Sequence, residues 1–148
     1  MDKQSIKRFA FAVNEQNQFE KKHFGDADKY LIFEWDKDSF IKKEEALNRF
    51  RDYDETQAHG SKKKGGAIIG FLKEKGVKVI VSMQFGKNIT LVNQHFVPII
   101  INQPDTSHAI ESITKHIKWI EDEFKINQSG FNVFSINNGI LKRKIDKA

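Results

Sequence analysis

The chain has 148 residues, of which 39% are hydrophobic and 30% charged, a composition that fits one globular domain with a sizeable core. It contains no cysteine, which excludes disulfides, thiol nucleophiles and cysteine-ligated zinc or iron-sulfur sites, and which is typical of a cytoplasmic protein. No segment reaches the roughly 20 apolar residues that span a bilayer, so no membrane partner is expected.

The net charge of +5 is concentrated in two short segments. The triplet Lys62-Lys63-Lys64 and residues 138–148 each contribute +3, so the rest of the chain carries −1. Because these lysines are not interleaved with aromatic residues along a face, the pattern favours a solvated loop and tail over a nucleic-acid groove.

The first half of the chain predicts three strands in an antiparallel meander. Residues 8–13 form an almost unbroken apolar run, as expected of a central strand buried on both faces. Residues 29–35 form the second strand, and a turn at 36–39 leads into a third that starts at 40–44 and could extend to residue 50. The polar stretch 51–66 is predicted to be the longest loop.

The next part predicts alternating helices and strands. Residues 65–76 fit a short helix and 77–82 a strand rich in branched side chains, which together are typical of a βα unit. A second short helix is predicted at 86–95 and a strand at 96–101. Pro98 cannot donate to a ladder, which indicates a strand at the sheet edge.

The last part predicts one long helix and a hairpin. The helix opens at Pro104-Asp105-Thr106-Ser107 and runs to about residue 125, with an apolar stripe at 3,4 spacing made of Ile110, Ile113, Ile117, Ile120 and Phe124. Asn138-Gly139 between two alternating segments indicates a β-hairpin.

This order predicts an α/β, three-layer domain with a mixed five-stranded sheet, plus a C-terminal β-hairpin. Residues 1–126 would form the domain and residues 127–148 an appendage. The arrangement resembles the ribonuclease-H-like fold, whose nucleases need carboxylates on the central strand to hold metal ions. The predicted central strand, 8–13, contains no acid, so nuclease activity is not expected.

Two segments resemble one protein family. The run Phe11-Ala12-Val13-Asn14 is followed by His23-Phe24-Gly25, and Val79 to Ile89 contains a strand, a glycine turn and the start of a short helix. These features resemble the dinitrogenase iron-molybdenum cofactor biosynthesis family over roughly residues 7–124. The turn departs from the family pattern, because Lys87 stands where proline is usual and a single glycine, Gly86, is present.

The resemblance implies a non-enzymatic carrier that binds an iron-sulfur or iron-molybdenum type cofactor, or a precursor, without cysteine ligands. It implies a metal ligand at His23 and a cofactor-binding set at the carboxyl ends of the strands: His23, Phe24, Gly25, His59, Gly86, Lys87 and Asn88. Imidazole can ligate iron, although His23 could equally hydrogen-bond a backbone group and shape its turn. The partners implied are the anionic cofactor and a cofactor-assembly protein.

Alternatives remain for the other histidines and for the function. His59 lies among lysines and glycines that suit an anion, or it belongs to a basic surface loop. His95 fits a helix C-terminal cap, and His108 and His116, eight residues apart, fit surface positions. The alternative function is a cofactor-free regulatory or protein-interaction module, with the C-terminal hairpin as its docking element.

Overall fold

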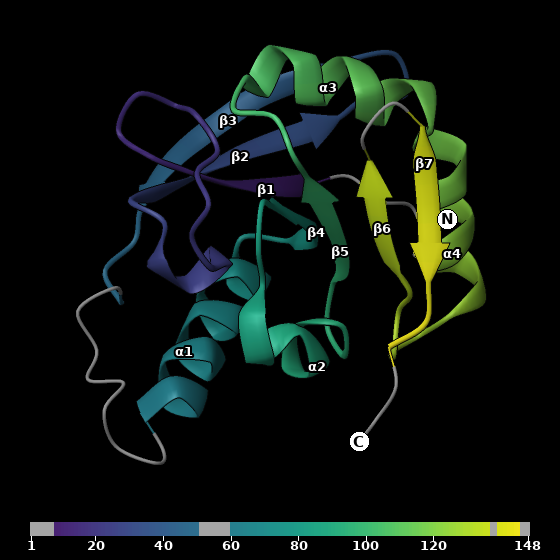
Figure 1. The fold of residues 1–148 in the computed structure, drawn as a ribbon. Coiled ribbons are helices and arrows are strands. Elements are labelled where there is room, and N and C mark those ends of the chain that lie inside the picture. The colour runs from purple at the N-terminus through teal and green to yellow at the C-terminus, as the bar shows by residue number, and fades with distance from the viewer. Residues whose placement is uncertain (1–7, 51–59, 137–138, 146–148) are drawn as a thin grey trace.

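The computed structural model describes residues 8–50, 60–136 and 139–145 (Figure 1). Its strands and helices follow each other in the order β1 (Arg8–Val13), η1 (Phe24–Asp26), β2 (Lys29–Trp35), β3 (Phe40–Leu47), α1 (Gly60–Glu74), β4 (Val77–Ser82), η2 (Gly86–Asn88), α2 (Ile89–Val92), β5 (Val97–Ile101), α3 (Thr106–Lys115), α4 (Ile117–Ile126), β6 (Val133–Ile136) and β7 (Ile140–Arg143).

All seven strands join one mixed sheet in the order β3-β2-β1-β4-β5-β6-β7. The predicted meander is confirmed, because β1 pairs antiparallel with β2, and β2 with β3. Strands β1, β4, β5 and β6 are parallel, and β7 returns antiparallel to β6. The apolar run of β1 is explained by its interior position between β2 and β4, although β4 is the middle strand.

The prediction of an α/β fold with a mixed sheet is confirmed, but the sheet has seven strands and not five. The predicted hairpin exists, and it continues the sheet because β6 pairs with β5 from Ile99 to Ile101. The edge position predicted from Pro98 is therefore wrong. Pro98 is accommodated inside the sheet because the ladder with β6 begins one residue after it.

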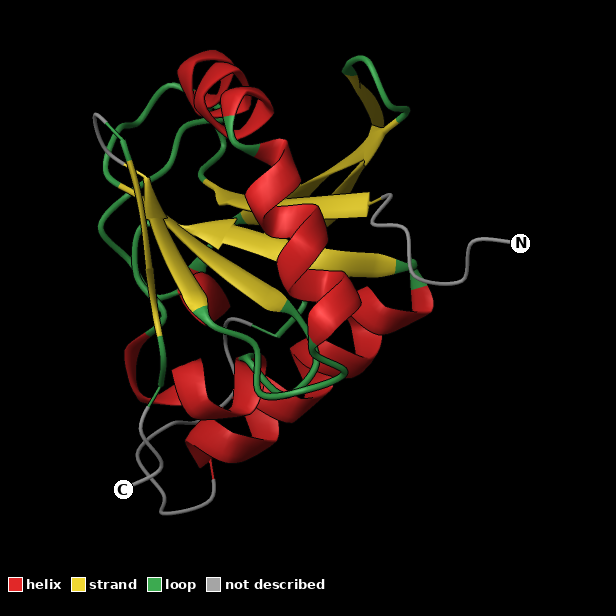
Figure 2. Ribbon diagram, turned by 90° about the vertical axis from the view of Figure 1, so that its right-hand side faces the viewer, coloured by secondary structure: helices red, strands yellow, loops and turns green. Residues whose placement is uncertain are grey.

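Helices cover both faces of the sheet, which gives three layers (Figure 2). One core lies between the sheet and the α3–α4 pair and includes Phe11, Val81 and Ile113. The other lies between the sheet and α1 with α2, and includes Ile32 and Leu72. No helix among the described residues is both long and apolar enough to cross a membrane.

The predicted long helix is divided into α3 and α4 at His116, whose backbone φ of −117° and ψ of 20° leave the helical region. The predicted start is confirmed, since the Asp105 side chain accepts a hydrogen bond from the Ser107 N–H at 2.8 Å. The five apolar stripe residues all pack on the α3–α4 core. The stripe thus identified the buried face but not the break.

The predicted loop over 51–66 is also corrected, because α1 already begins at Gly60. Residues 51–59, including His59, lie outside the described residues. Gly76 lies between the end of α1 and the start of β4 and has a left-handed φ of +76°. This agrees with the sequence, which predicted a glycine just after the helix.

Candidate functional site

Two turns meet at the carboxyl ends of β1 and β4, where the strand order of the sheet reverses direction. The turn after β4 forms a parallel bridge between Gln84 and His23, and the Phe24 N–H donates to the Gln84 carbonyl at 2.8 Å. The rings of Phe24 and Phe85 lie 5.6 Å apart beneath this bridge. Ligands of open α/β sheets bind at such a reversal point, so this pair of turns is the candidate site.

The His23 imidazole lies directly on Gly86. A Cβ atom built on Gly86 would lie 2.6 Å from Cε1, 2.7 Å from Nδ1 and 2.9 Å from Nε2 of that ring. Gly86 also has a left-handed φ of +64°, which glycine adopts without strain. The glycine therefore serves both the turn and the close approach of the imidazole.

Two buried polar side chains hold the His23 turn by hydrogen bonds to its backbone carbonyls. The Tyr30 hydroxyl donates to the Phe24 carbonyl at 2.7 Å, and Asn48 Nδ2 donates to the carbonyls of Gly25 and Ala27 at 2.9 and 2.8 Å. Sequence reasoning missed both residues. Tyr30 follows the turn closely in a buried strand, which is a usable signal, whereas nothing local marks Asn48, which comes from the end of β3.

Burial raises the pKa of the Tyr30 phenol strongly, and the nearby Asp26 charge raises it further. Because the folded state keeps this proton above pH 10 while the unfolded state loses it, stability is expected to fall as the pH rises beyond about 10. Tyr30→Phe should lose less stability over that pH range, and at neutral pH it should cost about 1 kcal/mol through the lost hydrogen bond. Urea unfolding of both proteins at pH 7 and pH 10.5 measures both effects, and equal pH dependence would contradict the assignment.

The remaining predicted residues divide between surface and core. Lys87 is exposed on the same turn as Gly86. Asn88 faces α1 instead, since a Cβ on Gly65 would lie 3.1 Å from its Nδ2 atom. Phe24 and Gly25 are buried, so they support the turn and do not face a ligand. The structure thus brings His23, Gly86 and Lys87 together at the surface.

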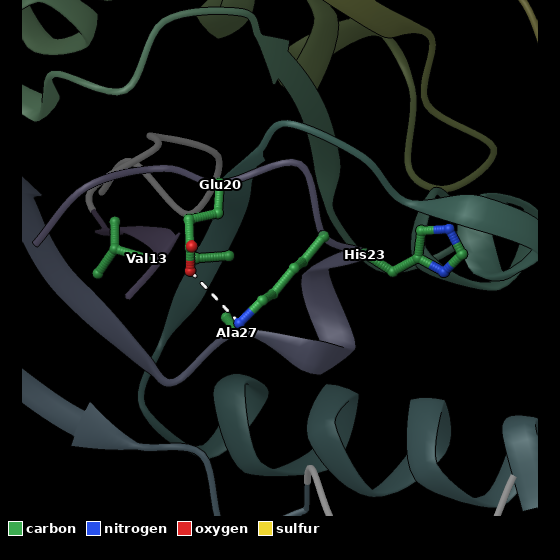
Figure 3. A pocket seen from close by; sticks show the side chains of 6 residues that line it. Val13, Glu20, His23 and Ala27 are labelled. Atoms are coloured by element: carbon green, nitrogen blue, oxygen red, sulfur yellow. Dashed lines mark ion pairs between the residues drawn. The ribbon is translucent and has the colours of Figure 1, made fainter. Parts of the chain in front are cut away.

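A small hollow lies next to the His23 backbone, on the side away from the imidazole ring (Figure 3). Glu20 and Lys22, which form an ion pair at 3.3 Å, line it together with Val13 and Ala27. Its volume of about 10 Å³ suits roughly one water molecule. The His23 ring points away from it in Figure 3, so a bulky ligand of His23 would lie outside the hollow.

The side chains that could ligate a metal determine which cofactors fit the site. No three His, Cys, Asp or Glu side chains converge to hold a metal ion among the described residues. A bare ion therefore finds no cage in this part of the chain. A preformed metal-sulfur cluster brings its own bridging sulfides and needs only terminal ligands from the protein, of which one exposed imidazole can supply one. His23 is exposed, and within the described residues no group hydrogen-bonds its ring nitrogens.

The other described histidines lie elsewhere in the fold. His95 Nδ1 lies 3.4 Å from the Lys73 ammonium, and burial, followed by that positive charge, lowers the His95 pKa. Its side chain contacts α1, and its backbone N–H donates to the carbonyl of Val92, the last residue of α2, at 3.0 Å. His108 is exposed on α3, as predicted, and His116 is half-buried at the break before α4.

A family model described as dinitrogenase iron-molybdenum cofactor matches residues 5–117. The matched segment contains both turns of the site and ends at the first residue of α4, so β6 and β7 lie beyond it. No curated protein and no solved structure matches the chain.

Proposed function

Because the chain belongs to the dinitrogenase iron-molybdenum cofactor family, we propose that it is a non-enzymatic carrier for an iron-molybdenum or iron-sulfur type cofactor, or for a precursor of one. We also infer that strands β3-β2-β1-β4-β5 correspond to the ribonuclease-H-like sheet, to which β6 and β7 are added. The cysteine-free composition supports a cytoplasmic location.

The observation that carries the proposal is the exposed His23 imidazole fixed on Gly86. Tyr30 and Asn48 hold the carbonyls of Phe24 and Gly25, the two residues that follow His23, so the ligand is presented from a supported turn. The exposed Lys87 ammonium on the facing turn would attract an anionic cluster. These three features suit the holding of a cofactor by one protein ligand, which permits its later release.

Two features support a role without catalysis. Strand β1 has the sequence Arg-Phe-Ala-Phe-Ala-Val, so it offers no carboxylate for two-metal phosphoryl chemistry. The described part of the candidate site presents an imidazole and an ammonium, and none of its described residues is a nucleophile oriented by a base.

The experiment is cofactor uptake by anaerobically purified full-length protein offered isolated iron-molybdenum cofactor. His23→Phe keeps a flat ring on Gly86 but removes both nitrogen donors, and at least a tenfold loss of bound iron and molybdenum is expected. His23→Cys, which restores an iron ligand, should regain uptake.

The matched control is His108→Phe, which changes another exposed histidine, on α3. It should bind as the wild type does, and circular dichroism of all variants should be the same. Wild-type metal content in His23→Phe would remove His23 from the proposal.

The second candidate is a cofactor-free regulatory or protein-interaction module. It is favoured by the lack of a three-donor group within residues 8–50, 60–136 and 139–145. If the wild-type protein itself takes up no cofactor in the same experiment, this candidate replaces the first.

A further inference from the structure

Among the described residues, strand β7 is one open edge of the sheet, and it lies outside the segment that matches the family. An edge strand presents unpaired backbone N–H and C=O groups, to which another extended chain can add as a further strand. Because β6 and β7 lie beyond the matched residues, the family match assigns no role to this edge.

The two edges of the sheet differ in charge. At the opposite edge, β3 carries two lysines and two glutamates, and these form ion pairs such as Lys42 with Glu45 and Lys75 with Glu44. The β7 edge carries Lys142, Arg143 and then Lys144, all exposed. Among the described residues no carboxylate pairs with Arg143 or Lys144, so these two positive charges are uncompensated in the part of the chain that the structure describes.

The two faces of β7 also differ. Ile140 packs on the α3–α4 core, and Lys142, on the same face, lies 3.9 Å from the buried carboxylate of Glu123. Leu141 pairs with Ser135 on the other face and is 64% exposed. The edge therefore combines open backbone groups, positive charge and one exposed apolar side chain.

We propose that β7 is a docking edge for an acidic, extended segment of a partner protein, which adds to the sheet as an eighth strand. Backbone hydrogen bonds to β7 supply the binding, glutamate or aspartate side chains pair with the basic residues, and an apolar side chain covers Leu141. The proposal does not depend on cofactor binding at His23.

The test uses full-length, cofactor-free protein and an eight-residue peptide made of two Val-Val-Glu-Glu repeats, which places valine and glutamate on both faces of the added strand, because Leu141 and Arg143 share one face of β7. Calorimetric titration should show binding that weakens with salt. The backbone N–H groups of a strand point alternately to its two edges, so N-methylation of every second peptide residue removes the donors along one edge only. The peptide methylated along the edge that faces β7 should lose binding, and the peptide methylated along the other edge should retain it. Equal binding of both methylated peptides would overturn strand addition.

Charge-reversing variants locate the site. Arg143→Glu combined with Lys144→Glu should weaken peptide binding at least tenfold, and it spares Lys142 because of its contact with Glu123. The control, Lys42→Glu combined with Lys43→Glu at the β3 edge, makes the same change in net charge and should alter the affinity less than twofold. Equal losses of peptide affinity in both double variants would overturn the proposal. A single-stranded oligonucleotide that displaces the peptide and binds more tightly than it would overturn the proposal as well.

Discussion

Replacement of Glu123 by alanine is expected to lower the free energy of unfolding by about 3 kcal/mol. The carboxylate on α4 is 2% exposed and accepts hydrogen bonds from Asn127 Nδ2 at 2.7 Å, from the Asn132 backbone N–H at 2.8 Å and from Asn132 Nδ2 at 3.0 Å. Alanine removes the acceptor of these donors from a buried position. Urea unfolding monitored by circular dichroism measures the loss.

Two variants separate this effect from a general effect of charge on α4. Asp122→Ala removes the adjacent, exposed carboxylate and should change stability by less than about 0.5 kcal/mol. Glu123→Gln keeps one acceptor oxygen but directs an amide toward the asparagine donors, so an intermediate loss is expected. A loss below about 1 kcal/mol in Glu123→Ala would show that water replaces the carboxylate.

The elements of the fold could largely be predicted, because hydrophobic periodicity and glycine turns are local signals. The joining of β6 to β5 was not predictable in this way, since strand pairing across α3 and α4 is a tertiary contact. The misplacement of Pro98 at an edge followed from the same omission. The break at His116 interrupts a stripe that is continuous in sequence, so the pattern alone predicts one helix.

The candidate site could be predicted in part. The His23 turn and the Gly86 turn were singled out from their sequence and by resemblance, and the structure brings them into contact. The supports from Tyr30 and Asn48 depend on how β2 and the end of β3 fold under the turn, which no spacing reveals. Burial likewise assigns Phe24 to the core, although its position in the motif indicated a place in the site.

Gly86→Ala is expected to impair cofactor uptake at least tenfold while the His23 ligand is still present. The new Cβ would occupy the place of the His23 ring, with three ring atoms within 2.9 Å, so the imidazole must move. Because His23 is exposed, its side chain can turn away, and the stability cost should be about 1 to 2 kcal/mol from the left-handed φ of +64°. Metal content and urea unfolding measure the two effects.

Gly130→Ala is the matched control for backbone strain. Gly130 has nearly the same φ, +66°, but a Cβ there would meet nothing within 4 Å. Both alanine variants should therefore lose the stability that backbone strain costs, Gly86→Ala should in addition lose the contacts of the displaced ring, and only Gly86→Ala should lose cofactor. In the double variant His23→Ala/Gly86→Ala the displaced ring is absent, so its stability loss should be smaller than the sum of the single losses. Strict additivity, together with full cofactor uptake by Gly86→Ala, would show that the glycine serves the turn alone and does not position His23.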